Sequence, residues 1–248
     1  MSILEVKGVS KRFGGIRALR ECSLSVKKGS ITALIGPNGS GKSTLFHVIS
    51  QLEDEDNGSI IVQGHDVSKY RPSNAHLVAR HGISRTFQDV RLFPNLTIRE
   101  HLSIALSTQD ESLWRNVFWK RELIDDSIIQ KWLSVVGLDK PLDTLASDLS
   151  YGQRKLLDLA IAIAKPHVLL MLDEPVAGVN PKLRTEIKNI IRKRVKEGDT
   201  ILVIEHDMNF VMDLADYVYV LDAGKVIAKG TPKQVQANKK VLAAYLGG

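Results

Sequence analysis

Cysteine is nearly absent from this sequence: Cys22 is the only one among 248 residues. A single cysteine excludes an internal disulfide and argues against a cysteine-based metal site, as is usual in a reducing cytoplasm. Long apolar runs are also missing, since no stretch approaches the roughly 18 residues that cross a bilayer. Residues 1–6 lack the basic segment and apolar core of a signal peptide. We therefore expect a cytoplasmic chain without a membrane span of its own.

The composition is that of an ordinary globular protein, with 44% hydrophobic and 25% charged residues. The net charge is +6, from 34 basic and 28 acidic residues. Such an excess can suit nucleic acid or an anionic membrane face. The densest basic cluster, residues 188–196, falls on a predicted helix, and we interpret it as a solvated helix face.

A glycine-rich stretch, residues 36–44, fits the phosphate-binding pattern G-x-x-x-x-G-K-[ST], which is called the P-loop. Residues 30–35 predict a buried strand ahead of it, and residues 43–50 predict a helix behind it. Glycine permits backbone angles at which several N–H groups converge on phosphate oxygens, and the helix directs its positive end to the same place. Lys42 is expected to reach the β- and γ-phosphates, and the Ser43 hydroxyl to coordinate Mg²⁺. The predicted phosphate-binding residues are Gly36, Pro37, Asn38, Gly39, Ser40, Gly41, Lys42, Ser43 and Thr44.

A pair of acidic residues marks a second part of the site. Residues 168–172 are all apolar, as expected for a strand buried on both faces, and Asp173 and Glu174 follow directly. Ligands of doubly wound sheets bind at the carboxyl ends of such strands. We expect Asp173 to hold Mg²⁺ and Glu174 to polarise a water molecule, a role typically worth about 10² to 10⁴ in rate.

The order of predicted elements indicates an α/β fold. Residues 1–35 are rich in β pattern. Residues 90–165 predict helices that include an N-cap at Thr97, a segment at 125–136, a segment at 154–165, and a tryptophan-containing stretch, Ser112 to Arg121. Strand and helix alternate again over 167–248. We expect one domain over 1–248: a core with an N-terminal antiparallel β subdomain (about 1–88 and 166–248) and an inserted α-helical subdomain (about 89–165).

Five motifs follow one another in a characteristic order: the P-loop, an isolated Gln88, the sequence Leu149-Ser150-Tyr151-Gly152-Gln153, the pair Asp173-Glu174, and a late His206. In this order and spacing the chain resembles ATP-binding-cassette (ABC) ATPases over nearly its whole length. The resemblance implies a P-loop NTPase (RecA-like) core that binds ATP and Mg²⁺.

The resemblance also assigns roles to single residues. Ser150, Gly152 and Gln153 match the signature that contacts the γ-phosphate from the opposite subunit. Gln88 matches a glutamine that contacts Mg²⁺ or water and couples to the membrane partner. His206 matches a histidine that contacts the γ-phosphate and organises Glu174. Phe13 matches the aromatic residue on which adenine stacks, with core packing as its alternative role.

Three positions depart from the family pattern. Tyr151 replaces the commoner second glycine of the signature, and Asn180 stands where an aspartate is usual. Phe13 stands where tyrosine is common, a change that preserves stacking. The first two bear on the geometry of the interface between two subunits, and neither removes a phosphate or metal ligand.

Within the family, the chain is most similar to ATPase subunits of branched-chain amino acid importers, with lipopolysaccharide-exporter ATPases as close relatives. The resemblance implies a second ATPase subunit, identical or paralogous, and integral membrane permease subunits as partners. It implies a peripheral location on the cytoplasmic face of the inner or plasma membrane, and no nucleic acid partner. The similarity is carried by residues 85–93, the insert around Trp114 and Trp119, Tyr151, residues 177–181 and the ending 244–247.

Two other classes fit less well. Soluble ABC ATPases that act on DNA or ribosomes carry long coiled-coil inserts or a second cassette, and this chain has neither. GTPases and small-molecule kinases share the P-loop, but the sequence contains no N-K-x-D guanine motif. The signature and His206 have no role in those enzymes.

Overall fold

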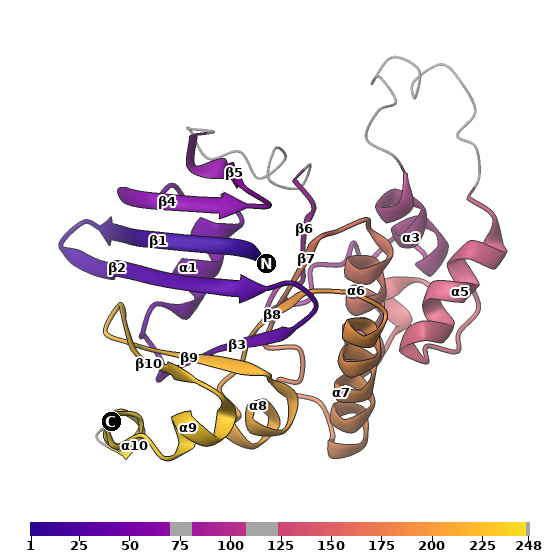
Figure 1. Ribbon diagram of the computed structural model, residues 1–248. Helices are drawn as coiled ribbons and strands as arrows, with labels where there is room; N and C mark the ends of the chain where they lie inside the picture. Colours follow the sequence, from indigo (N-terminus) through magenta and orange to yellow (C-terminus); the bar gives the residue numbers. More distant parts are fainter. Residues whose placement is uncertain (70–80, 108–123, 247–248) are drawn as a thin grey trace. The chain divides into compact units, whose positions relative to one another are not determined.

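The computed structural model describes residues 1–69, 81–107 and 124–246. The chain forms two compact units (Figure 1). The core unit contains Met1–Gln88, His167–Pro175 and Ile191–Gly248, and the helical unit contains Asp89–Pro166 and Val176–Ile190. The predicted stretch Ser112 to Arg121, with its two tryptophans, lies outside the described residues, as does Gly247 of the C-terminal ending.

The core unit begins with a four-stranded antiparallel sheet in the order β2-β1-β4-β5. The strands are β1 (Ser2–Phe13), β2 (Ile16–Lys27), β4 (Asn57–Val62) and β5 (His65–Asp66), followed by a 3₁₀ turn, η1 (Val67–Lys69). Buried and exposed residues largely alternate along β2, because one face of the sheet packs on the core and the other meets solvent.

A second, six-stranded sheet has the order β10-β9-β3-β8-β7-β6. All its pairs are parallel except β9–β10. Every residue of β3, β7 and β8 is buried, which explains why their sequences are apolar apart from Thr32 and Asp173. The strands are β3 (Ile31–Ile35), β6 (Ile83–Arg85), β7 (Leu169–Asp173), β8 (Ile201–Ile204), β9 (Tyr217–Asp222) and β10 (Lys225–Gly230).

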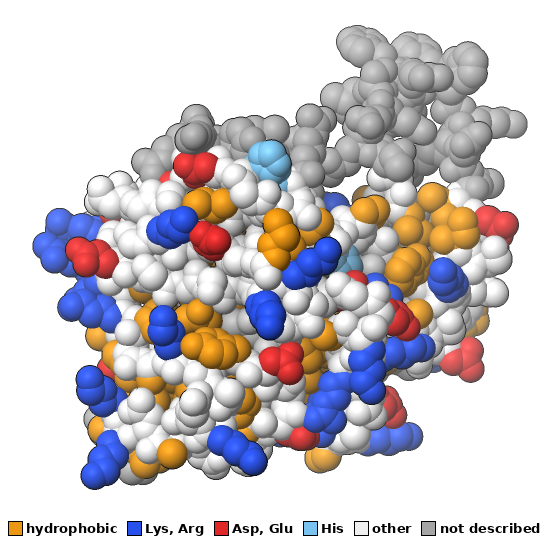
Figure 2. All heavy atoms as spheres, in the orientation of Figure 1, with side chains coloured by type: hydrophobic (Ala, Val, Ile, Leu, Met, Phe, Trp, Pro, Cys, Tyr) orange, Lys and Arg blue, Asp and Glu red, His pale blue; other side chains and the backbone are white. Residues whose placement is uncertain are grey.

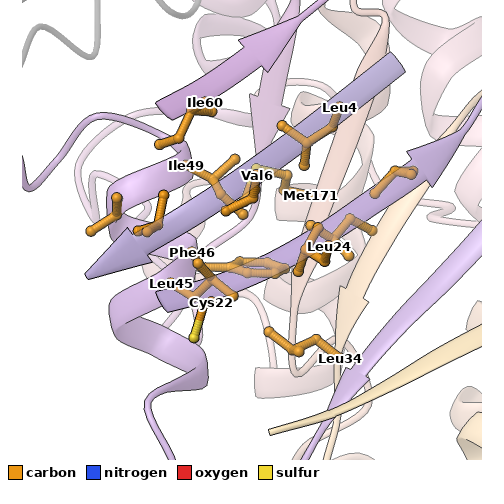
Figure 3. Packing of buried hydrophobic residues seen from close by; sticks show 14 of the residues in the cluster. Leu4, Val6, Cys22, Leu24, Leu34, Leu45, Phe46, Ile49, Ile60 and Met171 are labelled. Atoms are coloured by element: carbon orange, nitrogen blue, oxygen red, sulfur yellow. The ribbon is translucent and has the colours of Figure 1, made fainter. Parts of the chain in front are cut away.

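Helix α1 (Lys42–Ile49) joins the two sheets through one hydrophobic cluster. Phe46 is fully buried there, and side chains from β1, β2, β3, β4 and β7 gather around it (Figure 3). The helix that follows the P-loop is therefore fixed by the core of the molecule. Three short helices complete the unit: α8 (Met208–Leu214), α9 (Pro232–Gln236) and α10 (Lys239–Leu246). The sequence analysis did not predict them.

The helical unit contains α3 (Ile98–Leu106), α5 (Asp126–Val136), the 3₁₀ turn η2 (Ala146–Asp148), α6 (Tyr151–Ala164) and the first part of α7 (Pro181–Lys196). Thr97 and Glu100 form the predicted capping box at the start of α3. Helix α5 ends at Gly137, whose left-handed backbone closes the last turn.

One predicted boundary was wrong. The helix expected from Arg154 begins three residues earlier, at Tyr151. The reason is a capping box: Ser150 accepts a hydrogen bond from the Gln153 amide, and the Gln153 side chain accepts one from the Ser150 amide. The signature therefore forms the N-terminus of α6 and does not precede it as a loop.

The predicted basic helix face is α7, over which lysine and arginine side chains gather (Figure 2). Part of this charge is paired locally. Arg192 contacts Asp213, and Arg194 contacts Asp199 through two nitrogens. Among the described residues, no helix is long and apolar enough to cross a membrane.

Candidate active site

The candidate site lies at the carboxyl ends of four adjacent parallel strands of the core unit. In the sheet order β3-β8-β7-β6, the P-loop follows β3 and His206 follows β8. Asp173 ends β7 with Glu174 behind it, and Gln88 follows β6. Parallel strands present their carboxyl ends at one edge of a sheet, so residues far apart in the sequence meet there.

The P-loop requires glycine for space as well as for backbone angle. Gly36 has φ 154°, and a Cβ added to it would lie 2.0 Å from the Leu221 carbonyl oxygen. Gly41 has φ 103°, and its added Cβ would lie 2.5 Å from the Ala18 carbonyl oxygen. Gly39, with φ 77°, has no atom within 4 Å of such a Cβ and is needed for its angle alone.

The turn between β9 and β10 braces this loop from the other end of the chain. The Leu221 carbonyl oxygen lies against Gly36, as described above. In addition, the Gly224 amide donates a 2.9 Å hydrogen bond to the Ser40 carbonyl oxygen. The Gly224 carbonyl in turn accepts from the Arg20 amide at 2.8 Å. The P-loop is therefore shaped by the last third of the sequence as well as by its own glycines.

Lys42 lies over the concave side of its own loop. Its Nζ donates to the carbonyl oxygens of Gly36 at 2.8 Å and Pro37 at 2.9 Å. Burial lowers the pKa of Lys42, and the negative charges of Glu174 and Asp173 oppose that shift. The lysine thus places a cation against the loop backbone, where it also interacts with the charges of two carboxylates. Ser43, in the first turn of α1, has an exposed side chain.

Asp173 is held in a fixed orientation. Its Oδ2 accepts a 2.8 Å hydrogen bond from an Arg85 guanidinium nitrogen, and its backbone amide donates to Thr86 Oγ1 at 3.1 Å. Arg85 also donates to Ser50 Oγ at 2.9 Å, and its guanidinium carbon lies 5.5 and 5.0 Å from the ring centroids of Phe46 and Phe87. The sequence analysis included Arg85 only in the stretch 85–93 that carries the family similarity, and it missed this role.

The Glu174 side chain contacts two other predicted residues, Gln88 and His206. Gln88 Nε2 donates to its Oε2 at 3.1 Å, and His206 Nδ1 lies 3.5 Å from its Oε1. The Glu174 amide donates to the Ile204 carbonyl at 3.0 Å, and its backbone is left-handed, with φ 47°. A non-glycine residue in that conformation is held by its surroundings, and such positions cluster at functional sites.

Phe13, at the end of β1, is 44% exposed. Lys11 Nζ lies 5.0 Å from the ring centroid, and Lys11 itself is tied to the Asp54 carbonyl oxygen at 2.6 Å. The exposure does not fit the core-packing alternative. Ser150, Gly152 and Gln153 belong to the helical unit, whereas the residues described above belong to the core unit.

Comparison with known proteins decides the family. A sequence model described as "ABC transporter" matches residues 19–177. The chain belongs to the ABC transporter family. A second model, described as "Branched-chain amino acid ATP-binding cassette transporter", matches residues 225–248 of this ABC transporter chain.

Curated relatives of the ABC transporter chain match it over nearly its full length. A probable branched-chain amino acid transport ATP-binding protein LivG from Archaeoglobus fulgidus is 38% identical, covering 100% of this chain and 96% of its own length. The high-affinity branched-chain amino acid transport ATP-binding protein BraF from Pseudomonas aeruginosa is 37% identical, covering 99% and 98%. The predicted membership of the family, nearest its branched-chain amino acid branch, is confirmed.

Solved structures agree with the fold. A nucleotide-free ATP-binding cassette from an ABC transporter and the ADP conformation of such a cassette each have a TM-score of 0.84 and 34% identity, and cover 100% of both chains. The structure of cbiO1 from Clostridium perfringens, part of the ABC transporter complex cbiONQ, has a TM-score of 0.77 and 29% identity, and covers 99% and 94%. The predicted α/β P-loop fold is confirmed.

Proposed function

We propose that this chain is the ATP-binding and ATP-hydrolysing subunit of an ABC transporter that imports branched-chain or related amino acids. The observation that carries the proposal is the convergence of the P-loop, Asp173, Glu174 and His206 at adjacent strand ends. The substrate class is supported by the family match at residues 225–248 and by the names of the full-length relatives.

The residues present fit MgATP. The positive φ angles of Gly36, Gly39 and Gly41 are those that let loop amides converge on phosphate oxygens, and Lys42 supplies a nearby cation. Phosphate oxygens replace the carbonyl oxygens of Gly36 and Pro37 as hydrogen-bond acceptors of Lys42, so the ammonium group then neutralises phosphate charge. The Phe13 ring stacks on adenine. Ser43, Asp173 and Gln88 would hold Mg²⁺, which neutralises charge that develops on the phosphates.

Glu174 is the general base of the hydrolysis step. It takes a proton from the attacking water as the new oxygen–phosphorus bond forms and the bond to ADP breaks. Gln88 and His206, on opposite oxygens of the carboxylate, keep Glu174 oriented. His206 also contacts the γ-phosphate.

Two such chains form the working unit. Ser150, Gly152 and Gln153 at the N-terminus of α6 bind the γ-phosphate held by the P-loop of a second ATPase subunit, identical or paralogous. ATP clamps the two subunits together and hydrolysis releases them. Integral membrane permease subunits receive the motion through the segment after Gln88, so the chain is peripheral on the cytoplasmic face of the membrane.

The catalytic part is tested with Glu174→Gln. This substitution removes the base but keeps the size of the side chain, so ATP affinity is preserved while hydrolysis falls about 10² to 10⁴-fold. Glu186→Gln, at an exposed position of α7, is the matched control. Light scattering of the Glu174→Gln protein with MgATP reports the ATP-bound dimer. Hydrolysis at the wild-type rate would refute the assignment of Glu174.

The transport part is tested by affinity purification from gently solubilised membranes of the source cell. Recovery of polytopic membrane proteins, with uptake of labelled leucine that is lost on Glu174→Gln substitution, supports the proposal. A lipopolysaccharide-exporter ATPase is the second candidate, and unchanged leucine uptake would favour it. Recovery of soluble or nucleic-acid-bound partners alone would point to a non-transport ABC ATPase.

A further inference from the structure

Tyr151, the residue that departs from the signature pattern, turns toward a loop on the same helical unit. It is the first residue of α6. Its hydroxyl donates to the Ala177 carbonyl oxygen at 3.3 Å. Its ring lies against Gly178, where an added Cβ would be 3.1 Å from Tyr151 Cε1. One side chain thus makes a polar and an apolar contact to consecutive loop residues.

Two further contacts join the same segments. A Cβ added to Gly152 would lie 2.7 Å from Leu183 Cδ2, so the start of α6 packs closely on the start of α7. Asn180, the second departure from the family pattern, accepts a 2.9 Å hydrogen bond from the Leu183 amide through its side chain. The start of α6 and the segment 177–183 therefore form one packed structure, to which both unusual residues contribute.

The loop, residues 177–180, begins in a turn and contains a left-handed glycine. The Val179 amide reaches the Val176 carbonyl oxygen only at 3.5 Å, and Gly178 has a left-handed backbone with φ 71°. Glycine loses more conformational freedom than other residues when it is ordered. The contacts with Tyr151 help to order this loop, which begins three residues after Glu174 in the chain.

We propose that Tyr151 is a positioning residue that ties the 177–180 loop to the signature end of α6, and so sets the rate of ATP turnover without setting ATP affinity. The proposal rests on the proposed function. ATP affinity belongs to Lys42 and the P-loop in the core unit, whereas the loop and the signature belong to the helical unit. A less ordered loop should therefore slow ATP hydrolysis, which requires the signature of a second subunit, and should leave the affinity of a single chain for ATP unchanged.

The loop contact itself is tested by hydrogen exchange on the isolated chain. Tyr151→Phe removes only the hydroxyl, and exchange of the amides in 177–180 should become about fivefold faster, as expected for the loss of one neutral hydrogen bond. Tyr217→Phe, which removes a tyrosine hydroxyl in the core unit, is the control. Equal exchange in wild type and Tyr151→Phe, or an equal acceleration throughout the protein, would overturn the proposal.

The ring contact is tested by a double-mutant cycle. Gly178→Ala directs a methyl group at the Tyr151 ring in addition to straining the backbone. In a Tyr151→Gly background the ring is gone and only the strain remains. Gly178→Ala should then shift the urea midpoint less than it does in the wild-type background, and equal shifts would show that the ring does not press on the loop.

Steady-state kinetics test the proposed effect of Tyr151 on the rate of ATP turnover. Tyr151→Phe should lower kcat about threefold with KM for ATP changed less than twofold, and Tyr151→Gly should lower kcat further. A raised KM with unchanged kcat would overturn the proposal. The proposed function and the proposed role of Tyr151 can be refuted independently. A wild-type chain without ATPase activity would refute the proposed function, while hydrogen exchange would still test the loop contact. Unchanged loop exchange would leave the Glu174→Gln result intact.

Discussion

Arg85 and Asp173 form an ion pair at 2.8 Å in which the side chains are only 6% and 4% exposed. They come from neighbouring strands, β6 and β7, although 88 positions separate them in the sequence. The Arg85 guanidinium is further enclosed by two aromatic rings. Removing one partner of a buried ion pair is costly because the other charge is left without compensation.

Replacing Arg85 with methionine should therefore destabilise the protein strongly. The change keeps most of the side-chain volume but leaves the Asp173 charge buried without its cation, which costs about 3–5 kcal/mol. Urea denaturation followed by circular dichroism measures the loss. The control is Arg192→Met, whose partner Asp213 is 52% exposed, and there the loss should stay below about 1 kcal/mol. Equal losses would contradict the importance of burial.

Two glycines of the P-loop should respond differently to alanine. Gly39→Ala imposes only the strain of a left-handed backbone, about 1–2 kcal/mol, because no atom lies near the new Cβ. Gly36→Ala adds a clash with the Leu221 carbonyl, with overpacking of about 1–3 kcal/mol more. Urea midpoints of the two variants provide the comparison. Similar midpoints would show that the Leu221 contact is easily relieved.

Phe13 should contribute to nucleotide affinity and little to stability. Phe13→Ala removes the exposed ring and should weaken ATP binding about tenfold, since aromatic stacking on a base is worth about 1–3 kcal/mol. Phe13→Tyr should bind as wild type. Isothermal titration calorimetry makes the measurement, with Ile16→Ala, the cross-strand partner of Phe13, as control. If Phe13→Ala lowered the folding stability and left the affinity for ATP unchanged, Phe13 would be a packing residue and not an adenine contact.

The raised pKa of Asp158 should make the free energy of unfolding depend on pH. Burial raises the pKa of this α6 carboxyl from 3.8 to about 7, against the opposing charge of Lys155. Between these two values the folded chain holds a proton that the unfolded chain has released, so stability falls as the pH rises from about 4 to about 7. The change should reach about 2–4 kcal/mol, less than the full shift implies because the residue keeps some solvent contact.

The substitution Asp158→Asn should flatten this dependence. Urea denaturation at pH 5 and pH 8 should give similar free energies of unfolding for the variant and a lower value at pH 8 for the wild type. Asp148→Asn, an exposed aspartate of the same unit, should keep the wild-type difference. A wild-type slope in Asp158→Asn would assign the pH dependence to other groups.

Sequence reasoning succeeded where the signal is local. The buried strands β3, β7 and β8 are largely apolar runs, and the P-loop glycines stand between a strand and a helix pattern. The capping box at Thr97 is contained in four residues. Each of these features depends on neighbours in the sequence, so pattern and spacing were sufficient to predict them, whereas the P-loop NTPase core was implied by the family resemblance.

What escaped prediction depends on contacts distant in the sequence. Strand β6 has only three residues and is ordered by pairing with β7, which brings Arg85 to Asp173. The direction that Tyr151 takes from the start of α6 is set by a loop more than 20 residues later. The candidate site residues themselves were named from motifs, and their roles in catalysis stay predictions until the variants are measured.

The brace between the P-loop and the β9–β10 turn has a consequence for synthesis of the chain. A ribosome completes the phosphate-binding residues by Thr44, long before it adds Leu221 and Gly224, whose carbonyl and amide groups shape the loop. Strands β8 and β9, which flank β3, are also made late. A nascent chain therefore carries every phosphate-binding residue without the surroundings that order them. The capacity to bind nucleotide should therefore emerge only after Leu221 and Gly224 have been synthesised and the β9–β10 turn has formed.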